Sequence, residues 1–295
     1  KDVRKISIAK FISITGSSGK TSLKDLLSYS LNKLAPTTKS TQSFNNKFGV
    51  PLSLFNLKKN DKFAVLEVGM DKSGEIDNLT KIIRPNLGVI TNISYAHIKN
   101  FKSLTEIAKA KSEIIKNIVK GGKIILNQDD GYFKFIKKIA KKKNIHVISF
   151  SKNNSLSDIH IKKIIFNKIN TKIIVNIKNF TKSFLIKKNL YPYLYNILAS
   201  LATISEFYDL KNIDEKLFYN FKLPFSRGDI TKVRLRKKVI YLTDESYNSN
   251  PLSLKFAIEN FNNQNQRSKF LILGDMLELG KFSKILHKKM SKIIN

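Results

Sequence analysis

The sequence contains no cysteine, which excludes disulfide bonds and thiolate metal sites in its 295 residues. It also lacks any hydrophobic run that approaches the roughly 18 to 20 residues needed to cross a bilayer. Its first residues, KDVRKISIAKF, have neither the uninterrupted apolar core nor the cleavage site of a signal peptide. We therefore expect a cytoplasmic protein without a membrane span.

Acidic residues and arginine are both scarce. The chain has 22 Asp and Glu against 54 Lys and Arg, a net charge of +32, but only six of its basic residues are arginine. A basic surface attracts nucleic acid, yet specific phosphate and base recognition favours the arginine fork. The lysines are scattered among abundant Ile and Asn, as an A+T-rich coding sequence would produce. We favour compositional drift and expect no nucleic-acid partner.

Short apolar runs alternate with helical patterns through the first half of the chain, which predicts a parallel sheet covered by helices. The expected strands are residues 10–15, 63–69, 86–93, 123–127 and 146–150, and the expected helices are 21–34, 104–119 and 132–142. The β-rich segments over 159–187 have no helix between them, which predicts a small antiparallel section. A helix is expected over 194–208.

A second series of elements follows Pro224 and Gly228. It comprises the strand-like KVIYLTDES, a helix opened by Pro251, the strand-like KFLILGDM and a helix from about Phe282. This stretch is shorter than the roughly 100 to 150 residues of a typical domain. The sequence therefore predicts an α/β protein with a P-loop parallel-sheet domain over 1–223 and a partial Rossmann-like α/β domain over 224–295.

The segment GSSGKTS, residues 16–22, stands where the first strand turns into a helix. Glycine and serine make ordinary turns, and a hydroxyl residue can cap a helix. Backbone N–H groups at a helix start also form an anion site, and a lysine there can reach a polyphosphate. The segment departs from the general pattern G-x-x-x-x-G-K-[ST], because Ile14 occupies the first glycine position. Both interpretations remain open from the residues alone.

Three further residues are candidates for chemistry. Glu67 ends the apolar run FAVLEVG; it is either a Mg²⁺ ligand at the crevice of the sheet or a carboxylate exposed at a strand end. His97 follows GVITNISYA, where a loop or capping role is the simpler explanation. Lys111, in TEIAKAKSEII, would by itself be a solvated lysine, and Asp129 and Asp130 are most simply a turn and a helix cap.

Together these pieces resemble the Mur ligase family of ATP-dependent, amide-forming enzymes. Six motifs match in order: TGSSGKTS, FNNKFGVPLSLF, LEVGMDKSGEI, PNLGVITNISYAHIKNFKSLTEIAKAKSEI, DESYNSNPLSLKFAI and LGDMLELGKFSKILH. The shortened P-loop is the form found in that family. The second, fifth and sixth motifs are similar to the branch that adds D-alanyl-D-alanine to UDP-MurNAc-tripeptide through an acyl phosphate, in peptidoglycan synthesis.

The resemblance implies roles for named residues, with ATP and Mg²⁺ as cofactors. Lys20 would neutralise the terminal phosphates, and Lys111 would act as a carbamate that bridges metal. The metal ligands would be Thr21, Glu67, His97 and Lys111. The residues that bind ATP would be Gly16, Ser17, Ser18, Gly19, Lys20, Thr21, Ser22, Asn196, Arg227 and Glu245. The residues that contact the substrates would be Asn46, Tyr247, Asn248 and Asn250.

The chain also departs from the family pattern. Leu190 and Pro192 replace a glycine and a histidine near the adenine, Ser226 replaces the glycine before Arg227, and Glu245 stands where a ribose-binding acidic residue is expected. The resemblance implies a central ATP-binding domain over 1–223 and a partial C-terminal domain over 224–295, without the family's UDP-sugar-binding domain.

Several alternatives to this branch remain. They are a sister Mur ligase, a folylpolyglutamate synthase-like ligase, a nucleotide-binding fragment without full activity, and a basic nucleic-acid-binding P-loop ATPase. We expect UDP-MurNAc-tripeptide and D-alanyl-D-alanine as substrates and a monomer.

Overall fold

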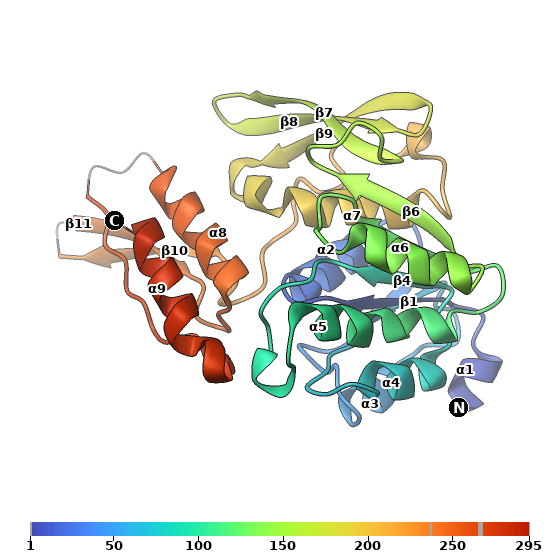
Figure 1. The fold of residues 1–295 in the computed structure, drawn as a ribbon. Helices are drawn as coiled ribbons and strands as arrows, with labels where there is room; N and C mark the ends of the chain where they lie inside the picture. Colours follow the sequence, from blue (N-terminus) through green and yellow to red (C-terminus); the bar gives the residue numbers. More distant parts are fainter. Residues whose placement is uncertain (1, 237, 265–267, 295) are drawn as a thin grey trace. The chain divides into compact units, whose positions relative to one another are not determined.

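The computed structural model describes residues 2–236, 238–264 and 268–294 (Figure 1). Contacts divide the chain into two units, one formed by Lys1–Ile93 with Thr105–Phe221 and the other by Ser94–Leu104 with Lys222–Asn295. Among the described residues, no helix is both long and apolar enough to cross a membrane. The assignment of 1–223 and 224–295 to two family domains stays a prediction.

The first unit is built on a nine-stranded sheet of order β2-β3-β1-β4-β5-β6-β7-β8-β9. Its strands are β1 Lys10–Thr15, β2 Thr37–Lys39, β3 Phe63–Glu67, β4 Leu87–Ile90, β5 Lys123–Asn127, β6 His146–Ser151, β7 Ile159–Phe166, β8 Asn170–Ile177 and β9 Phe180–Lys187. Pairing is parallel from β2 to β7 and antiparallel among β7, β8 and β9. The predicted α/β fold with a small antiparallel section is confirmed.

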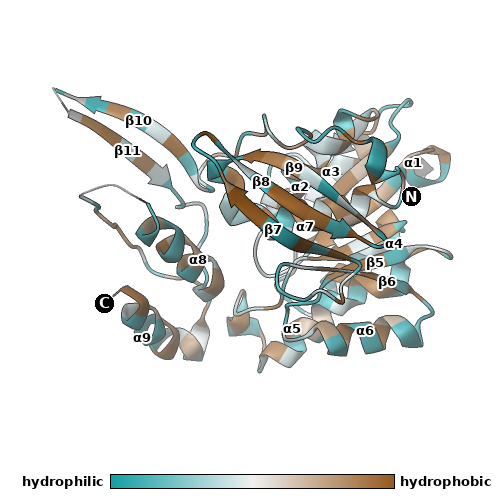
Figure 2. Ribbon diagram, turned by 90° about the horizontal axis from the view of Figure 1, so that it is seen from above, coloured by the Kyte–Doolittle hydropathy of each residue, from teal (hydrophilic) through white to brown (hydrophobic). Residues whose placement is uncertain are grey.

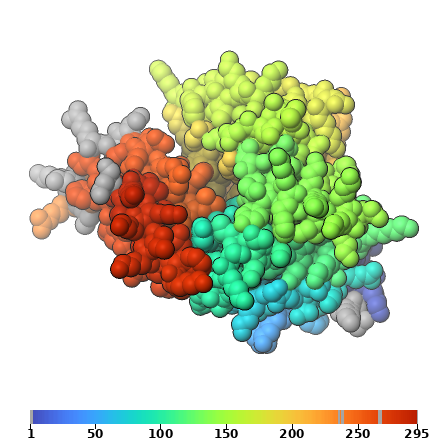
Figure 3. Space-filling view, in the orientation of Figure 1, coloured from blue at the N-terminus to red at the C-terminus, as the bar shows by residue number. Residues whose placement is uncertain are grey.

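Helices cover both faces of the parallel part, because each right-handed connection returns over one face and the strand order proceeds in both directions from β1. Helices α2 Lys20–Asn32 and α7 Leu194–Ile204 pack together on one face, while α4 Glu75–Ile83, the 3₁₀ turn η2 Ser112–Asn117 and α6 Phe133–Lys142 pack on the other. In Figure 3, α6 and the preceding green segments form the outer surface on that second side. Short elements complete the unit: α1 Asp2–Ile6, α3 Gly49–Phe55, η3 Lys188–Tyr193 and η4 Leu210–Asn212.

The helix expected over 104–119 is shorter in the structure. Helix α5 Leu104–Lys111 ends at Lys111, and the chain continues as the tighter η2. Both segments keep an apolar face toward the core, so hydrophobic periodicity alone did not reveal the change of helix type. This junction places the side chain of Lys111 in the interior, where it is 1% exposed.

The central antiparallel strand, β8, alternates between buried and partly exposed residues, as expected for a sheet with one packed face. Along β8, the buried positions are Thr171, Ile173, Val175 and Ile177. Figure 2 shows brown, apolar stretches along β7 and β8, whereas the surface helix α6 alternates between teal and brown. The apolar face of this meander packs on the unit's core.

The second unit contains η1 Ile98–Asn100, β10 Asp229–Leu235, β11 Lys238–Asp244, α8 Pro251–Asn262, η5 Gly280–Phe282 and α9 Ser283–Ile294. Strands β10 and β11 pair antiparallel as a two-stranded sheet. The expected strand over 269–276 is wrong, since none of these residues is in a strand. Phe270 and Ile272 are 88% and 94% exposed. A strand needs a neighbouring strand for its backbone hydrogen bonds, and among the described residues this segment has none.

Candidate active site

The turn between β1 and α2 is shaped by two glycines with positive φ. Gly16 has φ 149°, and a Cβ added to it would lie 1.8 Å from the hydroxyl oxygen of Thr91. Gly19 has φ 76° and stands at the N-cap position of α2. Only glycine adopts these conformations at little cost, so both positions are specified by the backbone. The first N–H groups of α2 have no partner within the helix, so the start of α2 has the donors that an anion site requires.

The end of β4 holds this turn in place. Ser17 N donates to the carbonyl oxygen of Asn92 (3.0 Å) and Ser18 N to its side-chain oxygen (3.0 Å). Thr91 Oγ1 and Asn92 Nδ2 both donate to Ser18 O, at 2.7 and 3.1 Å. These bonds fix the loop before any ligand arrives, which reduces the entropy that binding would cost.

Two lysines converge on one backbone oxygen of the loop. Lys20 Nζ donates to Gly16 O at 2.9 Å, and Lys111 Nζ donates to the same oxygen at 3.0 Å. Burial, and secondarily the nearby Lys20 ammonium, hold the pKa of Lys111 well below its usual range. A low pKa favours the neutral amine, and a neutral amine is the form that can react with CO₂ to give a carbamate.

Thr21 and Glu67 meet at the carboxyl ends of β1 and β3. Thr21 Oγ1 donates to Glu67 Oε2 at 2.8 Å, and Asn45 Nδ2 donates to Glu67 Oε1 at 2.8 Å. Glu67 is 1% exposed. The exposed-carboxylate alternative is therefore excluded. A hydroxyl and a buried carboxylate are oxygen donors of the kind Mg²⁺ prefers, so this pair fits such an ion.

The loop that carries Asn45 is fastened by a fully buried lysine. Lys24 Nζ donates to Gln42 O, and Lys24 also lies 3.5 Å from Asp25 Oδ1. Burial lowers the pKa of Lys24, while the charges of Asp25 and Glu67 oppose that shift. Lys24 therefore ties the loop after β2 to α2 and places a cationic side chain in the electrostatic environment of Glu67.

Asn196 is the other predicted nucleotide residue of the first unit. Its side-chain oxygen lies 3.4 Å from the position of a Cβ added to Gly19. Asn196 thus approaches the phosphate loop from α7. Leu190 is fully buried in the core, and Pro192 lies within η3. Neither Leu190 nor Pro192 has a polar side-chain group, so neither can supply the side-chain contact to the adenine that the family pattern implies for its histidine.

His97, Arg227, Glu245, Tyr247, Asn248 and Asn250 belong to the second unit. His97 Nδ1 lies 2.5 Å from Glu278 Oε2. The guanidinium of Arg227 stacks 4.0 Å above the ring centroid of Tyr247. The side-chain oxygen of Asn250 accepts from Leu252 N and Ser253 N and caps α8. The ligand roles of these residues stay predictions.

Asn46 has a structural role within the first unit. Its side-chain oxygen accepts from Phe48 N (3.1 Å) and Gly49 N (3.0 Å) at the start of α3. Its substrate contact stays a prediction. Asp129 and Asp130 lie in a turn, as predicted, and Asp130 Oδ1 accepts from Tyr132 N at 2.8 Å. The helix-cap part of that prediction is wrong, because the N-cap residue of α6 is Tyr132 and no side chain caps this helix.

Sequence reasoning missed four residues that shape this site: Lys24, Asn45, Thr91 and Asn92. A signal existed for Thr91 and Asn92, because they are polar residues at the carboxyl end of an apolar strand, as Glu67 is. No comparable signal marked Lys24, which reads as an ordinary polar helix position.

The sequence profile described as "Mur ligase middle domain" matches residues 14–204, which is more than half of the chain. The chain belongs to the Mur ligase family. The resemblance inferred from the motifs is thereby confirmed. This Mur ligase is 35% identical over 292 residues to the UDP-N-acetylmuramoyl-tripeptide--D-alanyl-D-alanine ligase of Buchnera aphidicola subsp. Baizongia pistaciae, covering 99% of this chain and 62% of the relative.

Solved structures give the same result for this Mur ligase. A crystal structure of MurF from Acinetobacter baumannii matches with a TM-score of 0.86 and 28% identity, covering 98% of this chain and 61% of that one. MurF ligase from Thermotoga maritima in complex with ADP matches with a TM-score of 0.87 and 25% identity, covering 99% and 66%. The chain thus spans less than two thirds of the length of these relatives.

Proposed function

We propose that this chain is the nucleotide-binding part of an ATP-dependent ligase that joins D-alanyl-D-alanine to UDP-MurNAc-tripeptide. The observation that carries the proposal is a set of three hydrogen bonds: Thr21 donates to buried Glu67, and Lys20 and Lys111 both donate to Gly16 O. The names of the relatives support the substrates. We also propose that the protein acts in the cytoplasm as a monomer.

The reaction needs an activated carboxylate, because a free carboxylate is a poor electrophile. ATP would transfer its terminal phosphoryl group to the carboxylate that ends the tripeptide, and the amine of D-alanyl-D-alanine would displace phosphate. Phosphoryl transfer is promoted mainly by positioning and charge stabilisation. Backbone N–H groups of residues 16–22 would bind the phosphates, and Lys20 would exchange its bond to Gly16 O for a terminal phosphate oxygen.

By the family pattern, Thr21 and Glu67 would hold one Mg²⁺, His97 would hold a second, and carbamylated Lys111 would bridge metal. When bound, the ions would supply positive charge at the phosphate oxygens. Carbamylation would convert Lys111 from a potential cation into an anionic oxygen donor. Asn196, Arg227 and Glu245 would contact ATP, and Asn46, Tyr247, Asn248 and Asn250 would approach the substrates.

Isotope transfer tests the acyl phosphate. UDP-MurNAc-tripeptide labelled with ¹⁸O in its terminal carboxylate is incubated with ATP, Mg²⁺, D-alanyl-D-alanine and the protein. We expect one ¹⁸O atom in the released phosphate and a pentapeptide product by mass spectrometry. Lys20→Ala is the matched control and should abolish both signals.

A panel of other amine acceptors identifies the branch. Product with a single amino acid instead of the dipeptide would assign the chain to a sister ligase or a folylpolyglutamate synthase-like enzyme. Nucleotide binding by the wild-type chain without any acceptor-dependent turnover would assign these residues to the alternative of a nucleotide-binding fragment without full activity. Hydrolysis stimulated by nucleic acid would support the nucleic-acid-binding ATPase instead.

A further inference from the structure

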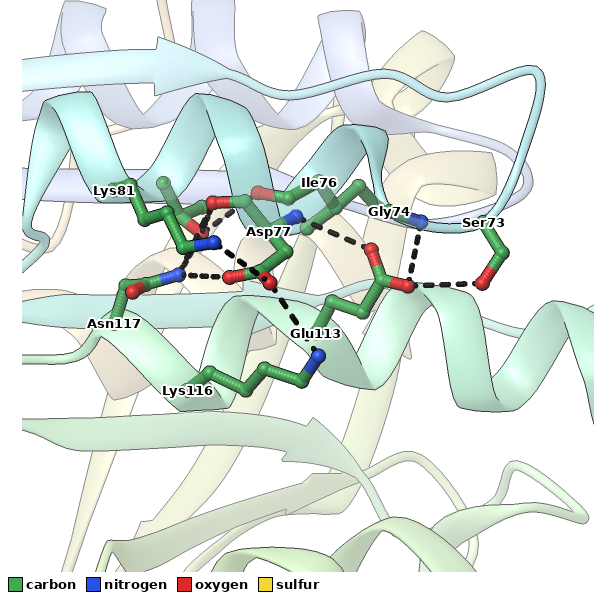
Figure 4. A network of polar contacts seen from close by, with 9 residues as sticks. Ser73, Gly74, Ile76, Asp77, Lys81, Glu113, Lys116 and Asn117 are labelled. Carbon is green, nitrogen blue, oxygen red and sulfur yellow. Dashed lines mark hydrogen bonds and ion pairs between the residues drawn. The ribbon is translucent and has the colours of Figure 1, made fainter.

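Helix α4 receives its N-terminal cap from a distant residue, Glu113 of η2. Gly74, at the N-cap position of α4, has no side chain to offer. Glu113 accepts from Ser73 Oγ (3.0 Å), Gly74 N (2.7 Å) and Asp77 N (3.1 Å) (Figure 4). A carboxylate at this position satisfies N–H groups that the helix cannot pair itself, and its charge suits the positive end of the helix.

A second attachment joins η2 to the body of the same helix. Asn117 Nδ2 donates to Asp77 Oδ1 at 2.8 Å and to Thr80 Oγ1 at 2.9 Å, and Lys116 Nζ lies 3.5 Å from Asp77 Oδ2. Figure 4 shows Glu113 at the start of α4 and Asn117 farther along it. The two attachments thus differ, because only Glu113 contacts the loop that precedes α4.

That loop begins at Glu67 and is held along its length. Gly69 N donates to Asn45 O (2.8 Å), whose side chain also binds Glu67. Asp71 N and Lys72 N both donate to Glu75 Oε2, at 2.6 and 3.0 Å. At the end of the loop, Glu113 accepts hydrogen bonds from Ser73 Oγ and Gly74 N, directly before α4 begins. The Glu113 carboxylate is therefore the last member of a series of contacts that starts at the Thr21–Glu67 pair.

Glu113 also lies two residues after Lys111, whose amine reaches Gly16 O. Glu113 is 7% exposed and Lys111 1% exposed, so this short segment is buried at both contacts. A shift of η2 relative to α4 would move Lys111 relative to the phosphate loop, because the two residues belong to adjoining helical turns.

We propose that Glu113 is a positioning residue that couples the loop following Glu67 to the segment carrying Lys111, and so sets the distance between these two prospective Mg²⁺-binding groups. The inference rests on the proposed function only in taking Glu67 and Lys111 to be Mg²⁺-binding groups. The coupling itself is a property of the first unit and can be measured without substrate.

Hydrogen exchange on the wild-type chain and its variants tests the coupling without nucleotide. Glu113→Gln keeps the size of the side chain but loses its charge and one acceptor oxygen. We expect exchange to rise about tenfold at residues 71–77 and also at residues 16–20. Asn117→Ala is the matched control within the same segment, η2. It should raise exchange in α4 and leave residues 16–20 within about twofold of wild type.

A double-mutant cycle tests the route through Lys111. In a Lys111→Met background, Glu113→Gln should produce no further change at residues 16–20, because the contact that transmits the shift is already lost. Ser73→Ala provides an independent variant if Glu113→Gln does not fold. It removes one donor to Glu113 and should change the same two segments in the same direction, by a smaller factor.

Nucleotide binding supplies the functional readout. Glu113→Gln should weaken ADP binding in the presence of Mg²⁺ about tenfold and leave metal-free ADP binding within about twofold, whereas Asn117→Ala should alter neither. The coupling is overturned if the Glu113 variants leave residues 16–20 and Mg²⁺-dependent binding as in wild type. Failure of wild-type protein to bind ADP would instead overturn the proposed function and leave the exchange result standing.

Discussion

At the scale of single residues, the site depends on backbone positions that tolerate only one amino acid. Gly16→Ala would place a methyl group 1.8 Å from Thr91 Oγ1 at a positive φ. We expect a loss of roughly 1 to 3 kcal/mol in the free energy of unfolding, from overpacking and backbone strain, and a loss of nucleotide binding. Chemical denaturation and ADP titration measure both.

Gly131→Ala is the matched control for this substitution. A Cβ added at Gly131 meets nothing within 4 Å. The variant should stay within about 0.5 kcal/mol of wild type and bind nucleotide normally. Equal losses in the two variants would contradict the role assigned to the contact between Gly16 and Thr91.

Lys111 gives a pH dependence whose sign follows from its lowered pKa. Between the folded and unfolded pKa values, the unfolded chain binds the proton and the folded chain does not. Stability therefore rises with pH in that window, which ends near the usual lysine value of about 10.4. Lys111→Met should be more stable than wild type at neutral pH, with an advantage that shrinks by up to about 1.4 kcal/mol per pH unit.

Urea denaturation in CO₂-free buffers from neutral pH to about pH 10 measures this effect. Lys109→Met, on the exposed side of the same helix, is the control and should track wild type at every pH. An advantage of Lys111→Met that did not vary with pH would mean that Lys111 keeps an ordinary pKa in the folded protein.

Local sequence patterns predicted part of this candidate site. Lys20, Thr21 and Glu67 were found because a glycine-rich turn and a carboxylate at a strand end are local patterns. The contact of Lys111 with Gly16 joins residues 95 positions apart. Nothing in the neighbourhood of either residue encodes that distance, so only the resemblance to a family singled out Lys111.

At the scale of elements, the antiparallel meander owes its stability to the buried face of its central strand. Ile173 of β8 is fully buried and lies opposite Ile164 of β7 and Phe184 of β9. Ile173→Ala should destabilise the protein by about 2 to 5 kcal/mol through lost burial and a residual cavity. Ile174→Ala, on the less buried face, should cost about 1 kcal/mol or less. Thermal and chemical denaturation of both variants measure the difference; similar costs would contradict the strand's register.

Strand and helix patterns were predicted well where neighbours in sequence are also neighbours in space. The strands 10–15 and 123–127 appear with the predicted bounds. Three predictions differ from the structure. The helix expected over 104–119 tightens after Lys111, the helix expected over 194–208 ends at Ile204, and the strand-like sequence 269–276 has no strand beside it among the described residues. The apolar pattern of a segment indicates which of its faces is buried, but a segment becomes a strand only where the rest of the fold places another strand beside it.

At the scale of the whole molecule, the net charge of +32 is the dominant electrostatic feature. Lysines in such excess repel one another more in the compact state than in the unfolded chain. We expect stability to rise on the order of 1 kcal/mol when NaCl is increased from about 0.02 M to about 0.5 M, because the Debye length falls well below the spacing of surface charges. Melting temperature measured across this range tests it, and a flat or falling profile would contradict net repulsion.

The sequence by itself determined the alternation of strands and helices, the glycine-rich turn and the family, because each of these is written in local spacing or in ordered motifs. Tertiary structure decided which side chains face Glu67, that Lys111 is buried against Gly16, and that Glu113 caps a helix 36 to 40 residues away. Those contacts depend on how the sheet stacks its strands and covers its faces. Burial, and with it the pKa of a lysine or the identity of a helix cap, exists only once the chain is folded.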